Sequence, residues 1–266
     1  MNQNTYTEEQ LGTGIMNVYD IGELRLHAYQ TNDPIDDEVF LVEKDGRVVI
    51  LESPCFYENN RELEQYLAAH GLRAEGMLLA YHMAGGSFLP GVKRYATKNA
   101  DEYGHAGGGR ALIDNFEKVF GERFDSSLHT VTDYLEEGEV TLAGIRFRIT
   151  ATPDAFDVEI PELNAVYTHM LGHDCHSIVA GAGHADALIA QLNGYLQQGY
   201  SLVLTSHYTP EDLKDVRTKI GYLENLKKMA ETCGNAEEFK TAVKARYKEY
   251  SGENYLDMTA GFFFEH

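Results

Sequence analysis

The sequence has few cysteines and few basic residues, and it contains no long apolar run. No hydrophobic stretch approaches the ~20 residues that a membrane-spanning helix needs, so we expect no membrane segment. Residues Met1–Thr5 lack the basic segment followed by an apolar one that marks a signal peptide. The three cysteines, Cys55, Cys175 and Cys233, are odd in number and far apart, which argues against a disulfide framework. Together these absences predict a soluble protein of a reducing, cytoplasmic compartment.

Basic residues are outnumbered by acidic ones. The chain has 22 Lys and Arg against 42 Asp and Glu, which gives a formal net charge of −20. Binding to phosphate backbones depends on lysine and arginine, and a strongly acidic surface repels such polyanions. We therefore expect neither nucleic acid nor an anionic membrane as a partner. A small-molecule substrate or ligand is the expected partner, and the sequence indicates no oligomeric state.

The first half of the chain shows the patterns of strands interrupted by one helix. With 266 residues, 43% of them hydrophobic, the chain is long enough for one domain over residues 1–266 with a sizeable core. Asp45-Gly46 is a strong hairpin signal, and Gly71 is placed to end the helix. The strand–helix–strand order favours a buried, partly parallel sheet. Strands are expected at 24–29, 38–43, 47–51 and 77–80, and a helix at 60–69.

The second half begins with a glycine-rich stretch and ends with a helical segment from about residue 209. Residues 98–110 are expected to form a loop, and Thr209-Pro210 is expected to start a helix that runs to about residue 231. Further strands are expected at 130–134, 139–142, 145–150, 157–160, 165–168, 201–205 and 258–264, and further helices at 111–120 and 236–250.

The order of these elements, over residues 20 to 230, resembles the metallo-β-lactamase superfamily. In that family a strand ends in a His-x-His-x-Asp-His loop, and later strand ends supply a histidine, an aspartate and a last histidine. Here the strand ends at Tyr81-His82, Thr150–Asp154 sits where the second histidine's turn belongs, and 164–169 and 202–207 resemble the last two strands. The resemblance implies an α+β fold, a four-layer αββα sandwich, with the site at an edge between the two sheets.

The family's metal motifs are altered in this sequence. After His82, residues Met83–Gly86 offer no ligand, Asp154 stands near the second histidine's place, and His169 or Met170 stands at the aspartate's place. The usual two-zinc site cannot form from these residues. Three or four nitrogen and oxygen ligands suffice for one zinc, iron or manganese ion, so we expect at most one metal. The candidate ligands, which are expected to converge, are His82, Asp154, His169 and His207.

Histidines also gather at His169, His173 and His176, with Asp174 and Cys175 between them. Spacings of four and three would put the three imidazoles on one face of a helix, although a glycine interrupts the segment. We expect at least one of them to bind metal or take part in catalysis, and the alternative is a polar loop over the sheet edge. Cys175 could be a nucleophile or a soft ligand, although a cysteine packed as a small apolar residue is the commoner case.

Two classes of function follow. One is a metal-dependent hydrolase of a small-molecule ester, thioester or amide, in which the metal polarises the carbonyl and lowers the pKa of its bound water toward ~7. His173 or Asp174 would then carry the proton. The other is a non-catalytic binding or regulatory protein on the same fold that has lost its metals. The dense histidines favour the enzyme, and the missing motif residues favour the binding protein.

Overall fold

The computed structural model describes residues 6–169 and 172–264. The chain forms two compact units. The first unit comprises Met1–His169 and Leu204–Pro210, and the second comprises Met170–Val203 and Glu211–His266. The expectation of one domain over residues 1–266 stays a prediction.

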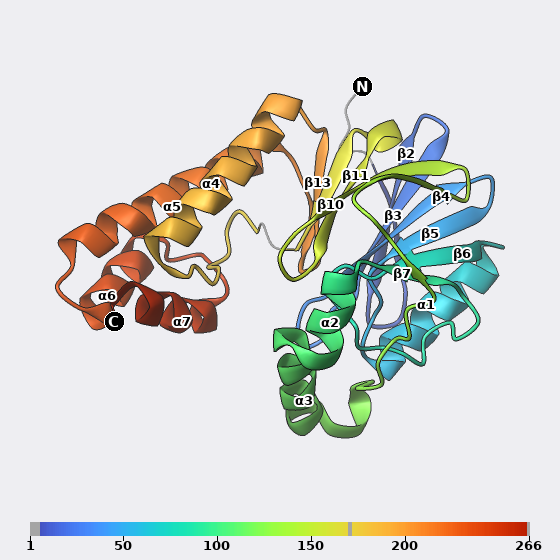
Figure 1. Ribbon diagram of the computed structural model, residues 1–266, viewed down its shortest axis with the longest axis horizontal. Helices are drawn as coiled ribbons and strands as arrows, with labels where there is room; N and C mark the ends of the chain where they lie inside the picture. The colour runs from blue at the N-terminus through green and yellow to red at the C-terminus, as the bar shows by residue number, and fades with distance from the viewer. Residues whose placement is uncertain (1–5, 170–171, 265–266) are drawn as a thin grey trace. The chain divides into compact units, whose positions relative to one another are not determined.

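An eight-stranded sheet forms a large part of the first unit (Figure 1). Its strands are β1 (Thr7–Gln10), β2 (Ile15–Ile21), β3 (Leu24–Gln30), β4 (Glu38–Lys44), β5 (Arg47–Leu51), β6 (Arg73–Leu78), β7 (Arg94–Ala96) and β8 (Asp133–Tyr134). They lie in chain order, antiparallel from β1 to β5 and parallel from β5 to β8. The β4–β5 hairpin turns at Asp45 and Gly46, whose φ angles are +54° and +71°, the backbone that a two-residue hairpin requires.

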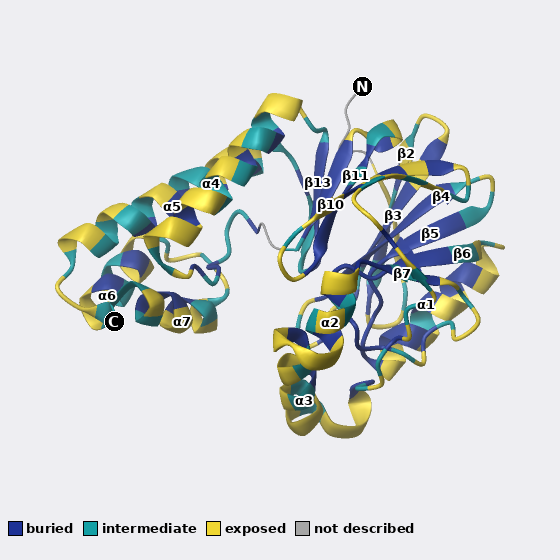
Figure 2. Cartoon of the chain, in the orientation of Figure 1, coloured by how far each residue is buried: buried dark blue, intermediate teal, exposed yellow. Residues whose placement is uncertain are grey.

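A second sheet has six strands in the order β14-β13-β12-β11-β10-β9. These are β9 (Gly138–Leu142), β10 (Ile145–Ala151), β11 (Phe156–Ile160), β12 (Ala165–Thr168), β13 (Leu202–Thr205) and β14 (Tyr208–Glu211). In β10 the alternate residues Ile145, Phe147 and Ile149 are buried, so one face of the strand points into the core (Figure 2). Phe40 of β4 meets Tyr167 of β12 edge to face, with ring centroids 6.2 Å apart, so the two sheets share this core.

Three helices complete the first unit: α1 (Tyr57–Ala69), α2 (Lys98–Ala106) and α3 (Gly108–Phe120). Helix α1 buries Leu63 and Tyr66, and it ends before Gly71 as the sequence predicts. The expected loop at 98–110 is wrong, because α2 occupies most of it, capped by Thr97, whose side chain accepts a hydrogen bond from the Ala100 amide. Helix α2 lies so close to the segment after β6 that a Cβ atom at Gly104 would fall 2.1 Å from a side-chain atom of Met83.

The described part of the second unit is mainly helical, with α4 (Gly181–Gln198), α5 (Leu213–Thr232), α6 (Ala236–Arg246) and α7 (Glu253–Phe264). Two expectations fail here. Thr209-Pro210 lies in β14, and α5 is capped instead by Asp212, whose side chain accepts from the Asp215 amide while the Asp215 carboxylate accepts from the Asp212 amide. Residues 258–264 form part of α7 rather than a strand, since a short apolar run fits either element. Among the described residues no helix is both long and apolar enough to span a bilayer.

Candidate metal centre

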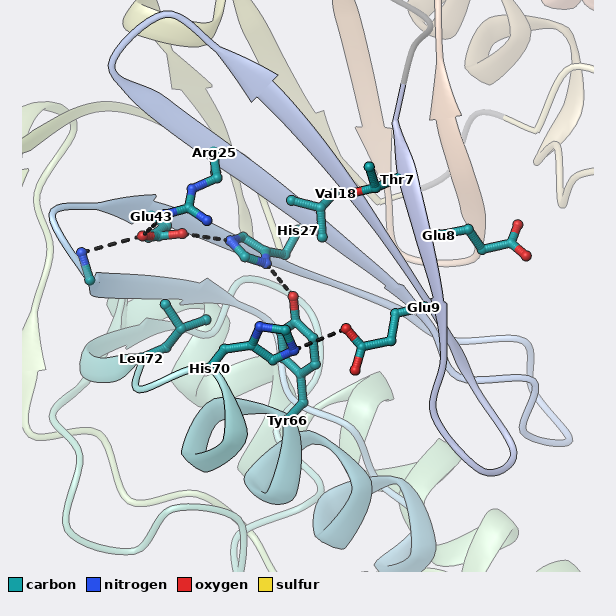
Figure 3. A pocket seen from close by; sticks show the side chains of 11 residues that line it. Thr7, Glu8, Glu9, Val18, Arg25, His27, Glu43, Tyr66, His70 and Leu72 are labelled. Carbon is teal, nitrogen blue, oxygen red and sulfur yellow. Dashed lines mark hydrogen bonds and ion pairs between the residues drawn. The ribbon is translucent and has the colours of Figure 1, made fainter.

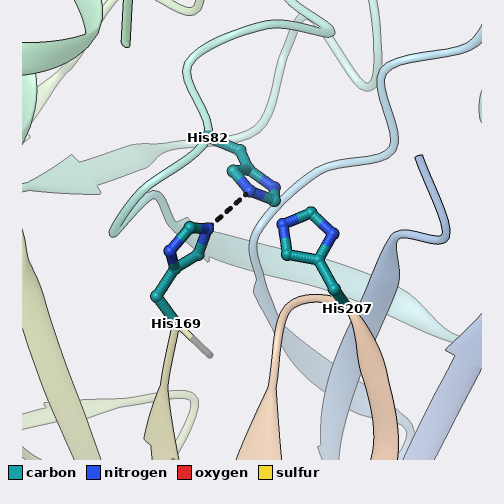
Figure 4. A group of neighbouring side chains, drawn as sticks. All are labelled: His82, His169 and His207. Atoms are coloured by element: carbon teal, nitrogen blue, oxygen red, sulfur yellow. Dashed lines mark hydrogen bonds between the residues drawn. The ribbon is translucent and has the colours of Figure 1, made fainter. Parts of the chain in front are cut away.

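Three histidines from three strand ends meet in the first unit (Figure 4). His82 follows β6 of the first sheet, His169 follows β12 of the second, and His207 lies between β13 and β14. Each offers a ring nitrogen within 4.8 Å of the others, and the ring centroids lie 5.1 to 5.4 Å apart. The structure thus brings three of the four candidate ligands together, where strands of both sheets end.

The spacing of the ring nitrogens suits one tetrahedral ion. His82 Nε2 and His169 Nε2 are 3.4 Å apart. Two imidazole nitrogens bound to one zinc at ~2.0–2.1 Å with tetrahedral angles would be about 3.4 Å apart. Three protein ligands with one open position are typical of catalytic zinc sites. The residues present therefore fit a single ion with room for water or substrate.

The Nδ1 atoms of His207 and His82 lie near acceptors, and a hydrogen bond to the Ile35 carbonyl orients the His207 ring. His207 Nδ1 lies 3.1 Å from the Ile35 carbonyl oxygen and 3.3 Å from Asp37 Oδ1. His82 Nδ1 lies 3.9 Å from the same Asp37 oxygen. Such contacts at Nδ1 leave Nε2 as the metal-binding atom. His169 is held differently, by stacking on the Tyr81 ring with centroids 4.5 Å apart.

Glu52 fixes the backbone at Tyr81 and His82. It is fully buried just after β5, with a φ of +64°, which is uncommon for a residue other than glycine. Its carboxylate accepts from the Tyr81 amide at 2.9 Å, the His82 amide at 3.1 Å and the Tyr167 hydroxyl at 2.7 Å. Burial raises the pKa of Glu52 to about 7, although these hydrogen bonds act to lower it. No pattern in the sequence points to this residue.

Burial makes the three imidazoles neutral at pH 7. Loss of hydration, together with the neighbouring His207, lowers the pKa of His82 to about 3, and loss of hydration lowers that of His207 to about 4. The pKa of His169 falls well below its usual value for the same reason, with added repulsion from the other two rings. Neutral imidazole is the form that binds metal, so the site is electrostatically prepared for a cation.

The fourth expected ligand, Asp154, lies elsewhere. Asp154 is exposed in the turn between β10 and β11, and it is not in the histidine group that the described residues form. The turn places it there because Ala155, not Asp154, is the buried residue of this segment. Met170 lies outside the described residues. A carboxylate that does lie beside His207 is Asp37, in the connection between β3 and β4, where no strand end marks it in the sequence.

His169, His173 and His176 do not share one face of a helix, since residues 172–180 contain no helix. His173 Nδ1 lies 2.8 Å from Glu211 Oε1 and 3.6 Å from Asp215, and its pKa is raised because these acids outweigh the effect of burial. His176 Nδ1 lies 2.9 Å from the Tyr222 hydroxyl.

The two residues next to His173 have partners within the second unit. The Asp174 side chain is half exposed, and its carbonyl accepts from the Ser251 amide. The Cys175 thiol donates to the His176 carbonyl at 3.1 Å. The roles predicted for His173 and Asp174 stay predictions.

The first unit also contains a pocket of about 370 Å³ beside α1 (Figure 3). At its base the buried His27 bridges the Tyr66 hydroxyl, 2.7 Å from Nδ1, and Glu43, 2.9 Å from Nε2. Near its rim His70 pairs with Glu9 at 2.9 Å. Because the polar groups at the base already satisfy one another, the pocket shows no group directed at a ligand.

Comparison with known proteins identifies the fold. No protein-family model matches the sequence, and no curated protein matches it. Among solved structures, the inverting sec-alkylsulfatase Pisa1 from Pseudomonas sp. matches with a TM-score of 0.64 and 12% identity over 93% of this chain, which spans 49% of the length of that protein. A metallo-β-lactamase family protein from Thermus thermophilus gives 0.60, 15% identity, and coverage of 88% of this chain and 91% of its own. A metallo-β-lactamase from Erythrobacter litoralis gives 0.56, 14% identity, and coverage of 82% and 100%.

These likenesses show the fold that the sequence resemblance predicts. The chain has the α+β sandwich of the metallo-β-lactamase superfamily, built from two facing sheets and seven helices in the described residues. At identities of 12% to 15% these matches establish the fold and not the function. Function has to be argued from the site.

Proposed function

We propose that this chain is a metal-dependent hydrolase that cleaves a small-molecule ester, thioester or amide with one divalent ion held by His82, His169 and His207. The observation that carries the proposal is the meeting of three imidazoles at strand ends, with two ring nitrogens 3.4 Å apart. When bound, a zinc, iron or manganese ion supplies Lewis acidity and a water of lowered pKa. His169 supplies the ligand at the place of the family's aspartate, and Asp154 is left out of the set.

The residues around the centre have defined tasks in this proposal. Asp37 and the Ile35 carbonyl hold His207 with Nε2 turned to the ion, and Glu52 holds the Tyr81 and His82 amides in place. Such positioning groups typically contribute 10–100-fold to metal affinity or activity. His173 or Asp174, in the second unit, remains the proposed proton carrier. The Pisa1 likeness adds a secondary alkyl sulfate to the esters worth testing.

The experiment measures metal content and hydrolysis together. Wild-type protein, purified without chelators, is compared with His169→Ala and with His70→Ala, in which a half-exposed imidazole away from the centre is removed. We expect one ion per chain at the histidine centre and hydrolysis of at least one ester, thioester, amide or sulfate ester, both lost in His169→Ala and kept in His70→Ala. A wild-type chain that binds no zinc, iron or manganese after reconstitution would refute the hydrolase and favour a binding protein that has lost its metals.

A further inference from the structure

A second group of possible ligands is buried near the histidine centre. Asp33 and Asp37 lie in the connection between β3 and β4, and Cys55 follows β5. They are 6%, 1% and 3% exposed. One ligand atom from each lies within 4.8 Å of the others, and Cys55 Sγ is 3.1 Å from Asp37 Oδ2. No part of the proposed hydrolysis uses Asp33 or Cys55.

One oxygen of Asp33 has a structural task and the other has none. Asp33 Oδ1 accepts from the Ile35 amide at 2.9 Å and from the Asp37 amide at 3.4 Å, which shapes the turn. In the part of the chain that the structure describes, the buried Oδ2 has no hydrogen-bond partner. Asp37 Oδ1 also lacks a well-formed hydrogen bond, although His207 Nδ1 is 3.3 Å away. A buried carboxylate oxygen without a partner is costly, so Asp33 Oδ2 requires an explanation.

The charge of the group points to a cation. Among the described residues no lysine or arginine forms an ion pair with Asp33 or Asp37, and the basic groups beside Asp37 are His82 and His207. Burial raises the pKa of Asp33, so a proton could neutralise it, but Oδ2 would still lack a hydrogen-bond partner among the described residues. A metal ion neutralises both carboxylates and occupies the unpartnered oxygen at the same time.

We propose that Asp33, Asp37 and Cys55 form a second metal site, which takes a divalent transition metal through two carboxylates and a thiolate. Thiolate favours zinc or cobalt over magnesium or calcium, which take oxygen ligands. On binding, the Cys55 sulfur–hydrogen bond is exchanged for a sulfur–metal bond, and the proton goes to solvent. This site goes beyond the proposed function, and it raises the expected metal content from one ion to two. Asp37 lies between the two sites, with Oδ2 toward Cys55 and Oδ1 toward His207.

The test uses the full chain, stripped of metal and titrated with Co²⁺. A cobalt–thiolate bond produces a charge-transfer absorption that imidazole and carboxylate ligands do not. We expect two equivalents of Co²⁺ in the wild type, with the thiolate absorption. Asp33→Asn should retain the amide contacts of Oδ1, replace only the unpartnered oxygen, and lose one equivalent together with the absorption. Cys55→Ser should lose the absorption, and Cys233→Ser, which removes a half-buried thiol of the second unit, should keep it.

His169→Ala separates this site from the histidine centre. His169 belongs to the histidine group and not to the Asp33 group, so this variant should lose one equivalent of Co²⁺ and keep the thiolate absorption. Circular dichroism of each variant checks that it folds, and Cys55→Ser provides the same test if Asp33→Asn does not fold. The second site is overturned if the folded wild type shows no thiolate absorption, or if the absorption persists in Cys55→Ser.

Discussion

His169 and His173 lie four residues apart in the sequence, but they belong to different compact units and have opposite electrostatic surroundings. In the first unit His169 is partly buried, and loss of hydration together with two neighbouring imidazoles lowers its pKa. In the second unit Glu211 and Asp215 raise the pKa of His173. The first environment makes a neutral ligand and the second favours a cation. Nearness in sequence therefore does not determine which histidines share an electrostatic environment.

Among variants that leave the histidine centre intact, removing His173 is expected to have the largest effect on the rate. If His173 carries the proton, His173→Ala should lower kcat by about 10²–10⁴-fold, the usual contribution of a general acid or base. The ion of the histidine centre should stay bound, because His173 belongs to a different group of possible ligands, with Glu211 and Asp215. Steady-state kinetics with metal analysis checks this, and Asp174→Asn run in parallel decides between the two carriers. An unchanged kcat in both variants would show that the His173–Glu211 pair is structural.

The free energy of unfolding should depend on pH with opposite signs through His207 in the first unit and His173 in the second. Because burial lowers the pKa of His207 to about 4, the metal-free folded chain takes up its proton later than the unfolded chain. The contribution of His207 to the free energy of unfolding is present above about pH 6.5. It falls by roughly 3 kcal/mol on acidification to pH 4, at ~1.36 kcal/mol for each pH unit. His173 has a raised pKa, so its contribution is present below about pH 6.5 and is lost as the pH rises through its folded value.

NMR titration of the metal-free chain measures these pKa values directly. The imidazole signals of His82 and His207 should remain those of the neutral ring at pH 5, whereas His173 should still be an imidazolium above pH 6.5. Assignments come from single His→Gln variants. If His82, His207 and His173 all titrated near pH 6.5, the predicted difference in pKa between the two units would be wrong.

Glu211→Gln should have the smallest of these effects, a lower free energy of unfolding. The Glu211 carboxylate is 2% exposed and accepts from the Gly172 amide, the His173 amide and the His173 ring. The amide keeps the shape but weakens the bonds to a charged acceptor, so we expect a loss of about 2 kcal/mol in the free energy of unfolding. Urea denaturation measures it, with Glu237→Gln, whose side chain is 81% exposed, as the control. Equal midpoints for the two variants would contradict the role given to Glu211.

Local signals in the sequence predicted the elements whose formation is local. Asp45-Gly46 predicted the β4–β5 hairpin, because the turn chemistry resides in those two residues. Helix α2 was missed because the glycine-rich stretch ending at Gly107–Gly109 indicates a loop. In the structure Gly104, within α2, allows close packing on Met83. The apolar run in α7 was assigned to a strand because seven residues cannot distinguish the two periods.

The candidate site was predictable only where a ligand stands at the end of a recognisable strand. His82, His169 and His207 satisfy that condition. Asp37 lies in an irregular connection, and only tertiary structure brings it beside His207, which comes much later in the chain. Asp154 fits the family's place in the sequence, but the local turn exposes it. Strand ends therefore indicate the proposed ligands but not the groups beside them.

Glu52 has a consequence for how this fold would diverge. One buried carboxylate joins the end of β5, the amides after β6 and the Tyr167 hydroxyl of β12, and none of these contacts requires a metal. A descendant chain that lost all three histidines would still need an acceptor at this position to fold. Across relatives, an acid here should therefore outlast the histidines, and its presence would mark shared ancestry of the scaffold rather than retained chemistry.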